Sequence, residues 1–147
     1  MSPNKPPHNN PYAQAASAYG THAQKHTPDQ RELEGRVLLK AANMLKDLYD
    51  NWDSANRDVI EATLKYNRQI WLMFYDAALE NPEGNRPSDL RSNILNLANF
   101  IFQREVEIVT EPKREKLEIL ININREIATG LMSNQASTAP AKEPEKK

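Results

Sequence analysis

The sequence predicts an all-α fold: a single-domain bundle of four long helices, preceded by a short helix and framed by disordered tails. Apolar residues recur every three or four positions in four long segments between residues 28 and 131, which is the spacing of one helix face. Prolines stand where these segments begin and end, as helices require. With 147 residues, 39% of them hydrophobic and 27% charged, the chain suits one globular domain with its own core.

The two ends of the chain differ in composition from the middle. Residues 1–10 carry three prolines among polar residues, and residues 133–147 are rich in Ser, Ala, Pro, Lys and Glu. Such segments bury too little apolar surface to become ordered. We therefore expect disordered tails around a helical domain that spans residues 11–132.

A short first helix is expected from Asn10 and Pro11, an N-cap followed by a first-turn proline, to about residue 24. It places Tyr12 and Tyr19 on one side, but it has few large apolar residues and is weak alone. We hypothesise that the two tyrosines dock in a groove of the domain, and that a partner helix can displace them.

The second helix begins at Thr27 and Pro28, a capping residue followed by a first-turn proline. Charged residues lie mostly on one side of it, so we expect it to be peripheral. Asp53 or Ser54 would cap the next helix. The apolar stripe of the second helix comprises Leu33, Val37, Ala41, Met44 and Leu48.

Residues 60–79 form the expected central helix. Its main apolar line, interrupted by Asn67, contains Ile60, Leu64, Trp71, Phe74 and Ala78. A second line beside it contains Val59, Thr63, Tyr66, Ile70, Met73 and Ala77. Because the two lines together cover more than half of the circumference, we expect neighbours on at least two sides.

Pro82 ends the central helix, and a fourth helix starts near Pro87. The main apolar stripe of the fourth helix runs through Ile94 and Ile101, and a second apolar line ends at Val106. Glu105 and Glu107 of this helix would form a solvated edge. A fifth helix starts near Pro112. A β-strand is the alternative for residues 119–123, but charged flanks and a lack of turn residues favour a helix.

The overall charge excludes some function classes. Nineteen basic and 20 acidic residues give a net charge of −1, so no global field attracts nucleic acid or an anionic membrane. The chain has no cysteine, its apolar runs are too short to span a bilayer, and its first 30 residues lack a signal-peptide core. We expect a cytoplasmic protein.

Enzymatic signatures are also missing. The sequence has no glycine-rich phosphate loop, no nucleophile elbow and no histidine after residue 26. His22 and His26 have a metal-ligand spacing, but no third ligand is evident, and an exposed helix end explains them better. We expect no catalytic activity, no metal and no cofactor.

Two similar tracts, residues 66–71 and 123–128, place an Asn-Arg pair within an apolar helix. A buried amide must find a partner, so Asn67 and Asn124 should each bond to another helix or to the neighbourhood of the other asparagine. Their role is then either to fix helix register or to contact a partner protein. Arg68 and Arg125 should pair with acids of facing helices.

Taken together, these tracts resemble the FlaF family of bacterial flagellar biosynthesis regulators from residue 12 to residue 131. The resemblance rests on Tyr12, Ala16, Tyr19, Arg31, Glu32, Ala41, Ala42, Tyr66, Asn67, Arg68, Trp71, Phe74, Asn81, Pro82, residues 90–94 and residues 121–131. It implies a small cytosolic helical protein that is needed for flagellin synthesis and secretion, and that acts with flagellin and opposite a post-transcriptional repressor of flagellin. No catalytic residues are carried over from the family.

Three functions follow as expectations. The first is a chaperone-like regulator that binds flagellin. The second is a regulator that acts on flagellin mRNA or its repressor complex. It would use a local basic face of Arg104, Lys113, Arg114, Lys116 and Arg125. Acids are interleaved with these residues, so direct nucleic-acid binding is the weaker expectation. The third is a structural adaptor that dimerises through Trp71 or its neighbours. The candidate partner-binding or family-motif residues are Tyr12, Tyr19, Tyr66, Asn67, Arg68, Trp71, Arg91, Asn93, Asn124 and Arg125.

Overall fold

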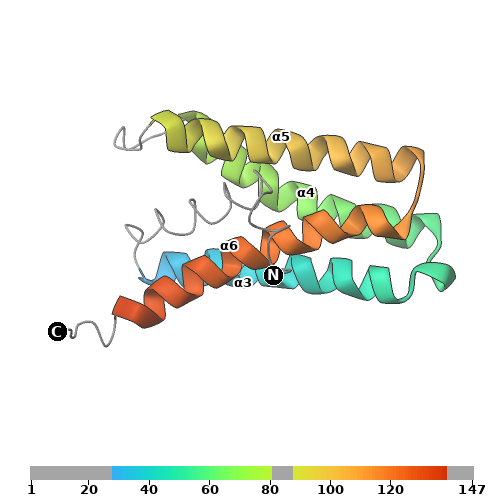
Figure 1. Cartoon of the computed structure of the whole chain (residues 1–147), viewed down its shortest axis with the longest axis horizontal. Coiled ribbons are helices and arrows are strands. Elements are labelled where there is room, and N and C mark those ends of the chain that lie inside the picture. Colours follow the sequence, from blue (N-terminus) through green and yellow to red (C-terminus); the bar gives the residue numbers. More distant parts are fainter. Residues whose placement is uncertain (1–27, 81–87, 139–147) are drawn as a thin grey trace, which may run out of the picture.

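The computed structural model describes residues 28–80 and 88–138, and these residues form four long helices (Figure 1). The elements in chain order are α3 (Pro28–Asp50), η2 (Trp52–Ser54), α4 (Arg57–Glu80), α5 (Ser88–Thr110), η3 (Arg114–Leu117) and α6 (Glu118–Thr138). The described part of the chain contains no β-strand, so residues 119–123 are helical as expected. The predicted tail at residues 1–10, the short helix with Tyr12, Tyr19, His22 and His26, and residues 139–147 lie outside the described residues.

Successive helices run in opposite directions, so the bundle is up-down-up-down (Figure 1). The closest helix pairs are α3 with α6 and α4 with α5, and α3 also packs along α4. This arrangement confirms the predicted all-α bundle. It also places α4 between a neighbour on each side, α3 and α5, as a central helix requires.

The helix ends differ in detail from the sequence expectations. Asn56, not Asp53 or Ser54, caps α4, because its Oδ1 accepts a 2.9 Å hydrogen bond from the backbone N–H of Val59. Residues 52–54 instead form the short 3₁₀ turn η2. The fifth predicted helix likewise starts with a 3₁₀ turn, η3, and α6 continues past the expected boundary at residue 132 to Thr138.

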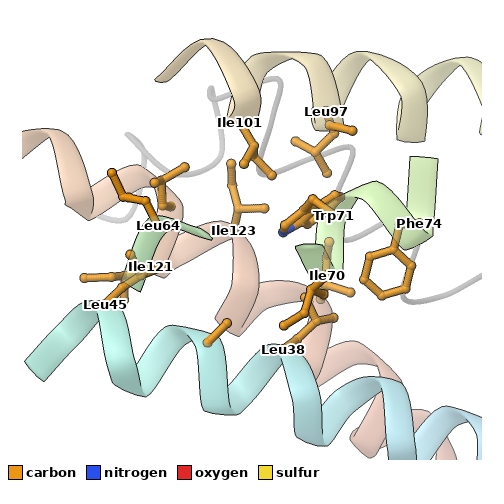
Figure 2. Close-up of a cluster of buried hydrophobic side chains, with 14 of the residues drawn as sticks. Leu38, Leu45, Leu64, Ile70, Trp71, Phe74, Leu97, Ile101, Ile121 and Ile123 are labelled. Atoms are coloured by element: carbon orange, nitrogen blue, oxygen red, sulfur yellow. The ribbon is translucent and has the colours of Figure 1, made fainter. Parts of the chain in front are cut away.

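The core is built from all four helices around Trp71, whose side chain is fully buried (Figure 2). Its ring meets that of Phe74 edge-on, with a centroid separation of 5.3 Å. The main apolar line of α4 is buried as predicted, together with Thr63 and Ile70 of the second line.

Of the other residues of the second line, Tyr66 is partly buried against the core, whereas Val59, Met73 and Ala77 are exposed. Val59 is 47% exposed and Met73 is 69% exposed, so the apolar surface of α4 is wider than the surface that its neighbours cover. Leu33 of α3 and Val106 of α5, which were also expected in apolar stripes, are exposed as well.

Candidate functional site: a buried polar network

Two asparagines meet in the centre of the bundle. Asn67 of α4 and Asn124 of α6 are both buried on the core-facing side of their helices. Nδ2 of Asn124 donates a hydrogen bond of 2.7 Å to Oδ1 of Asn67. The expectation that each amide bonds across to another helix is therefore confirmed, and the bond joins the two similar tracts of the sequence directly.

Trp71 lies one turn after Asn67 on α4 and joins the same network. Its indole Nε1 donates to Oδ1 of Asn124 over 2.9 Å. A buried indole N–H normally needs such an acceptor, and the largest side chain of the core thereby gains a fixed orientation. Asn67 and Trp71 together tie α4 to a single residue of α6.

Glu105 of α5 ends the network on the other side of Asn67. Nδ2 of Asn67 donates to Oε2 of Glu105 over 2.9 Å, and only 2% of Glu105 is exposed. The expected solvated edge at Glu105 is therefore wrong. The helical spacing does place Glu105 on the buried face of α5, because Glu105 follows Ile101 by four residues and precedes Ile108 by three, and both isoleucines are buried.

Arg68 connects this network to the surface. Its NH1 atom lies 3.4 Å from Oε1 of Glu105, and its own side chain is 43% exposed. The predicted ion pair of Arg68 with an acid of a facing helix is thus confirmed. A half-solvated guanidinium at this distance compensates the buried carboxylate only in part.

Burial raises the pKa of Glu105 to about 7, while the hydrogen bond from Asn67 and the charge and hydrogen bond of Arg68 act in the opposite direction. Desolvation wins because the carboxylate receives one neutral donor and one distant cation in place of water. The network therefore contains a carboxyl group whose pKa lies near neutral pH and whose side chain is almost completely buried.

The hydrogen bonds run in one direction through three helices. Trp71 donates to Asn124, Asn124 donates to Asn67, and Asn67 donates to Glu105. Each amide therefore uses both its oxygen and its nitrogen within the protein. Such a chain has strict geometric requirements, so it fixes the relative register of α4, α5 and α6.

Comparison with protein-family models gives a match to the family described as flagellar protein FlaF, over residues 15–131. The chain belongs to this family. All five residues of the polar network lie within the matched region. Comparisons with curated proteins and with solved structures gave no match.

The remaining candidate residues of this FlaF-family chain lie apart from the network. Tyr66 is partly buried, with Nζ of Lys40 5.2 Å from its ring centroid. Arg91 donates to the carbonyl oxygens of Ala78 and Leu79 over 2.8 and 2.9 Å, so it caps the C-terminal end of α4. Asn93 is exposed on α5.

Among the residues that the structure describes, Arg125 lacks the predicted acidic partner. Its side chain is exposed, and within the described residues no ion pair joins it to an acid. It lines a shallow hollow with Tyr49 and Glu118, whose side chains are joined by a 2.9 Å hydrogen bond. The two similar tracts therefore place their asparagines together but give their arginines different surroundings.

The basic residues near the α5–α6 turn mostly bind within the protein. Arg104 pairs with Glu107 over 3.2 Å, and Lys113 lies 3.7 Å from Glu111. Lys116 donates to the carbonyl oxygens of Glu107 and Glu111, and so caps α5. The side chains that were expected to form a basic face are therefore largely committed to local contacts.

Among residues 28–80 and 88–138, no group of three or more His, Cys, Asp or Glu side chains is arranged to hold a metal ion. No helix in these two stretches has the length and hydrophobicity needed to cross a membrane.

Proposed function

We propose that this flagellar protein is a non-enzymatic regulator of flagellar biogenesis that binds flagellin as a chaperone-like partner in the cytoplasm. The observation that carries the proposal is the difference between the buried and the exposed side chains of α4. Its buried polar side chains bond to one another, whereas large apolar side chains such as Met73 remain on its surface. A surface of this kind suits recognition of another apolar element.

The alternatives receive less support from the contacts. Binding to flagellin mRNA would need cations that are free to meet phosphates, and Arg104 and Lys116 bind groups of α5 while Lys113 forms a surface ion pair with Glu111. A dimeric adaptor could not associate through Trp71 itself, because that side chain has no exposed surface. It would have to use the neighbours of Trp71, of which Leu72 and Met73 are 42% and 69% exposed. The partnership with the repressor of flagellin synthesis stays a prediction from the family resemblance.

Isothermal titration calorimetry with purified monomeric flagellin tests the proposal. We expect saturable binding to full-length flagellin, and loss of binding when the flagellin end that is recognised has been removed. Truncation of each end in turn identifies which one that is. An absence of binding to the full-length monomer would refute the proposed function.

A further inference from the structure

Apolar side chains line the outer edge of the seam between α3 and α4. The helices α3 and α4 are antiparallel (Figure 1). Nζ of Lys40 on α3 lies 5.2 Å from the ring centroid of Tyr66 on α4, which fixes the alignment of the two helices. Seven residues make about two helical turns, so Leu33 and Met73 occupy the same seam two turns away toward the start of α3. Leu33 is 62% exposed and Met73 is 69% exposed.

The other end of this seam is hollow. Two turns from Tyr66 in the opposite direction lies Val59, which lines a hollow of about 390 Å³ and is 47% exposed. Met44, Leu48, Ala55 and Thr63 share this hollow with it. We call the surface from Leu33 and Met73 to this hollow the α3–α4 strip.

The size of the α3–α4 strip fits one helix. Leu33 and Leu48 are 15 residues apart on α3, a length of about 22 Å at 1.5 Å per residue. A helix roughly 10 Å wide would therefore cover about 200 Å² of it. A stable dimer of two copies buries about 800 Å² per partner, which is several times more.

Two charges give the strip a direction. Lys40 stands at its centre and Asp47 on the rim of the hollow, two turns apart along α3. Within the described residues, neither side chain has an ion-pair partner. A bound helix would gain from an acidic residue that faces Lys40 and a basic residue two turns away that faces Asp47.

We propose that the α3–α4 strip is the docking groove for a single amphipathic helix of a partner protein. The helix presents apolar residues at positions i, i+4, i+7 and i+11 to the strip, and its largest apolar side chain enters the hollow beside Val59. In naming flagellin as the partner, this inference rests on the proposed function. A designed peptide tests the groove independently of flagellin.

Glutamate substitutions on the two sides of α4 provide the test. Leu33→Glu and Met73→Glu place a charge in the strip. The controls, Leu72→Glu and Val106→Glu, place the same charge near the α4–α5 seam. The side chains of Leu72 and Val106 are 42% and 64% exposed. We expect the strip variants to weaken binding of full-length flagellin about tenfold or more in calorimetry, and the controls less than about twofold. Equal effects, or larger effects of the controls, would overturn the groove.

A second probe separates failure of the groove from failure of the proposed function. It is an 18-residue helical peptide with the apolar spacing above, an acid placed to face Lys40 and a base placed to face Asp47. We expect it to bind the full chain, to bind Met73→Glu at least about tenfold more weakly, and to lose affinity when its two charges are exchanged. The exchanged peptide should regain affinity for the Lys40→Glu, Asp47→Lys double variant.

The outcomes are distinct. If the peptide binds in this way and flagellin does not, the proposed function fails and the groove stands. If neither probe binds, the groove is overturned.

A concentration-dependent rise in mass that Met73→Glu abolishes would assign the strip to a second copy. A loss of thermal stability in Met73→Glu that disappears when residues before Thr27 are deleted, together with flagellin binding that neither Met73→Glu nor the deletion changes, would assign the strip to the chain's own N-terminal segment alone. Each of these last two results also overturns the proposal.

Discussion

Replacement of Glu105 by glutamine should change how the stability of the bundle depends on pH. Burial raises the pKa of this carboxyl from 4.5 to about 7 in the folded protein. The folded state therefore holds the proton more tightly than the unfolded chain does. The resulting stabilisation is fully present below about pH 4.5 and is lost as the pH rises through about 7.

The size of this effect follows from the two pKa values. At 1.36 kcal/mol per pKa unit, a shift of about 2.5 units between 4.5 and about 7 corresponds to about 3 kcal/mol. Glutamine is neutral at every pH, and its carbonyl oxygen can still accept the hydrogen bond from Asn67. Glu105→Gln should therefore remove most of this dependence, and at pH 8 the variant should be more stable than the wild type by about 1 to 3 kcal/mol.

Urea unfolding followed by circular dichroism between pH 4.5 and 8 measures the difference. Other carboxylates contribute to both curves, so the free energy of unfolding of the wild type minus that of the variant isolates Glu105. Glu107→Gln is the matched control, because Glu107 lies on the same helix but is 58% exposed and forms a surface ion pair. If the curves of wild type and Glu105→Gln run parallel from pH 5 to 8, the buried carboxyl does not titrate as argued.

Four further predictions concern stability and binding. Trp71→Ala should lower the free energy of unfolding by about 3 to 5 kcal/mol; a fully stable variant that loses binding would instead make Trp71 a contact residue. Asn124→Ala leaves Trp71 Nε1 and the oxygen of Asn67 without partners and should cost about 2 to 4 kcal/mol in urea unfolding, against a small change for the exposed Asn122→Ala. Arg91→Ala uncaps α4 and should cost about 0.5 to 1.5 kcal/mol in thermal unfolding; no change would show that water replaces the guanidinium. Deletion of residues before Thr27 should tighten flagellin binding, and unchanged or weaker binding would contradict displacement of that segment.

The sequence predicts the helices and the meeting of the two asparagines because both depend on local rules. Helical periodicity shows which residues share a face, and proline and capping residues mark the ends. A buried amide also requires a partner wherever it lies, so Asn67 and Asn124 could be expected to bond before their positions were known.

Glu105 could not be recognised in the same way. Its spacing places it on the buried stripe of α5, but a glutamate is almost never buried unless a partner compensates it. Those partners, Asn67 and Arg68, lie on another helix almost 40 residues earlier in the chain. Only the pairing of α4 with α5 reveals them, and that pairing is a property of the assembled bundle.

The exposure of Val59 and Met73 has a similar origin. Periodicity shows how wide the apolar surface of α4 is, but not how much of it the neighbours cover. In the bundle, α3 and α5 flank α4 on either side of its buried line, and the side chains at the edge of the α3 seam remain in solvent. An apolar surface wider than the core requires is the reason to expect a partner there.

The helix α4 contributes buried side chains to the polar network and exposed side chains to the α3–α4 strip. This links the stability of the bundle to recognition of the partner. Asn67 and Trp71 fix how α4 is rotated against α6, and the same rotation decides whether Val59, Tyr66 and Met73 point toward the α3 seam. A change in the network that lets α4 rotate should therefore weaken binding and stability together. A charge placed in the strip should weaken binding alone, since exposed positions contribute little to the core. The two kinds of variant therefore distinguish the residues that hold α4 in place from the residues that contact the partner.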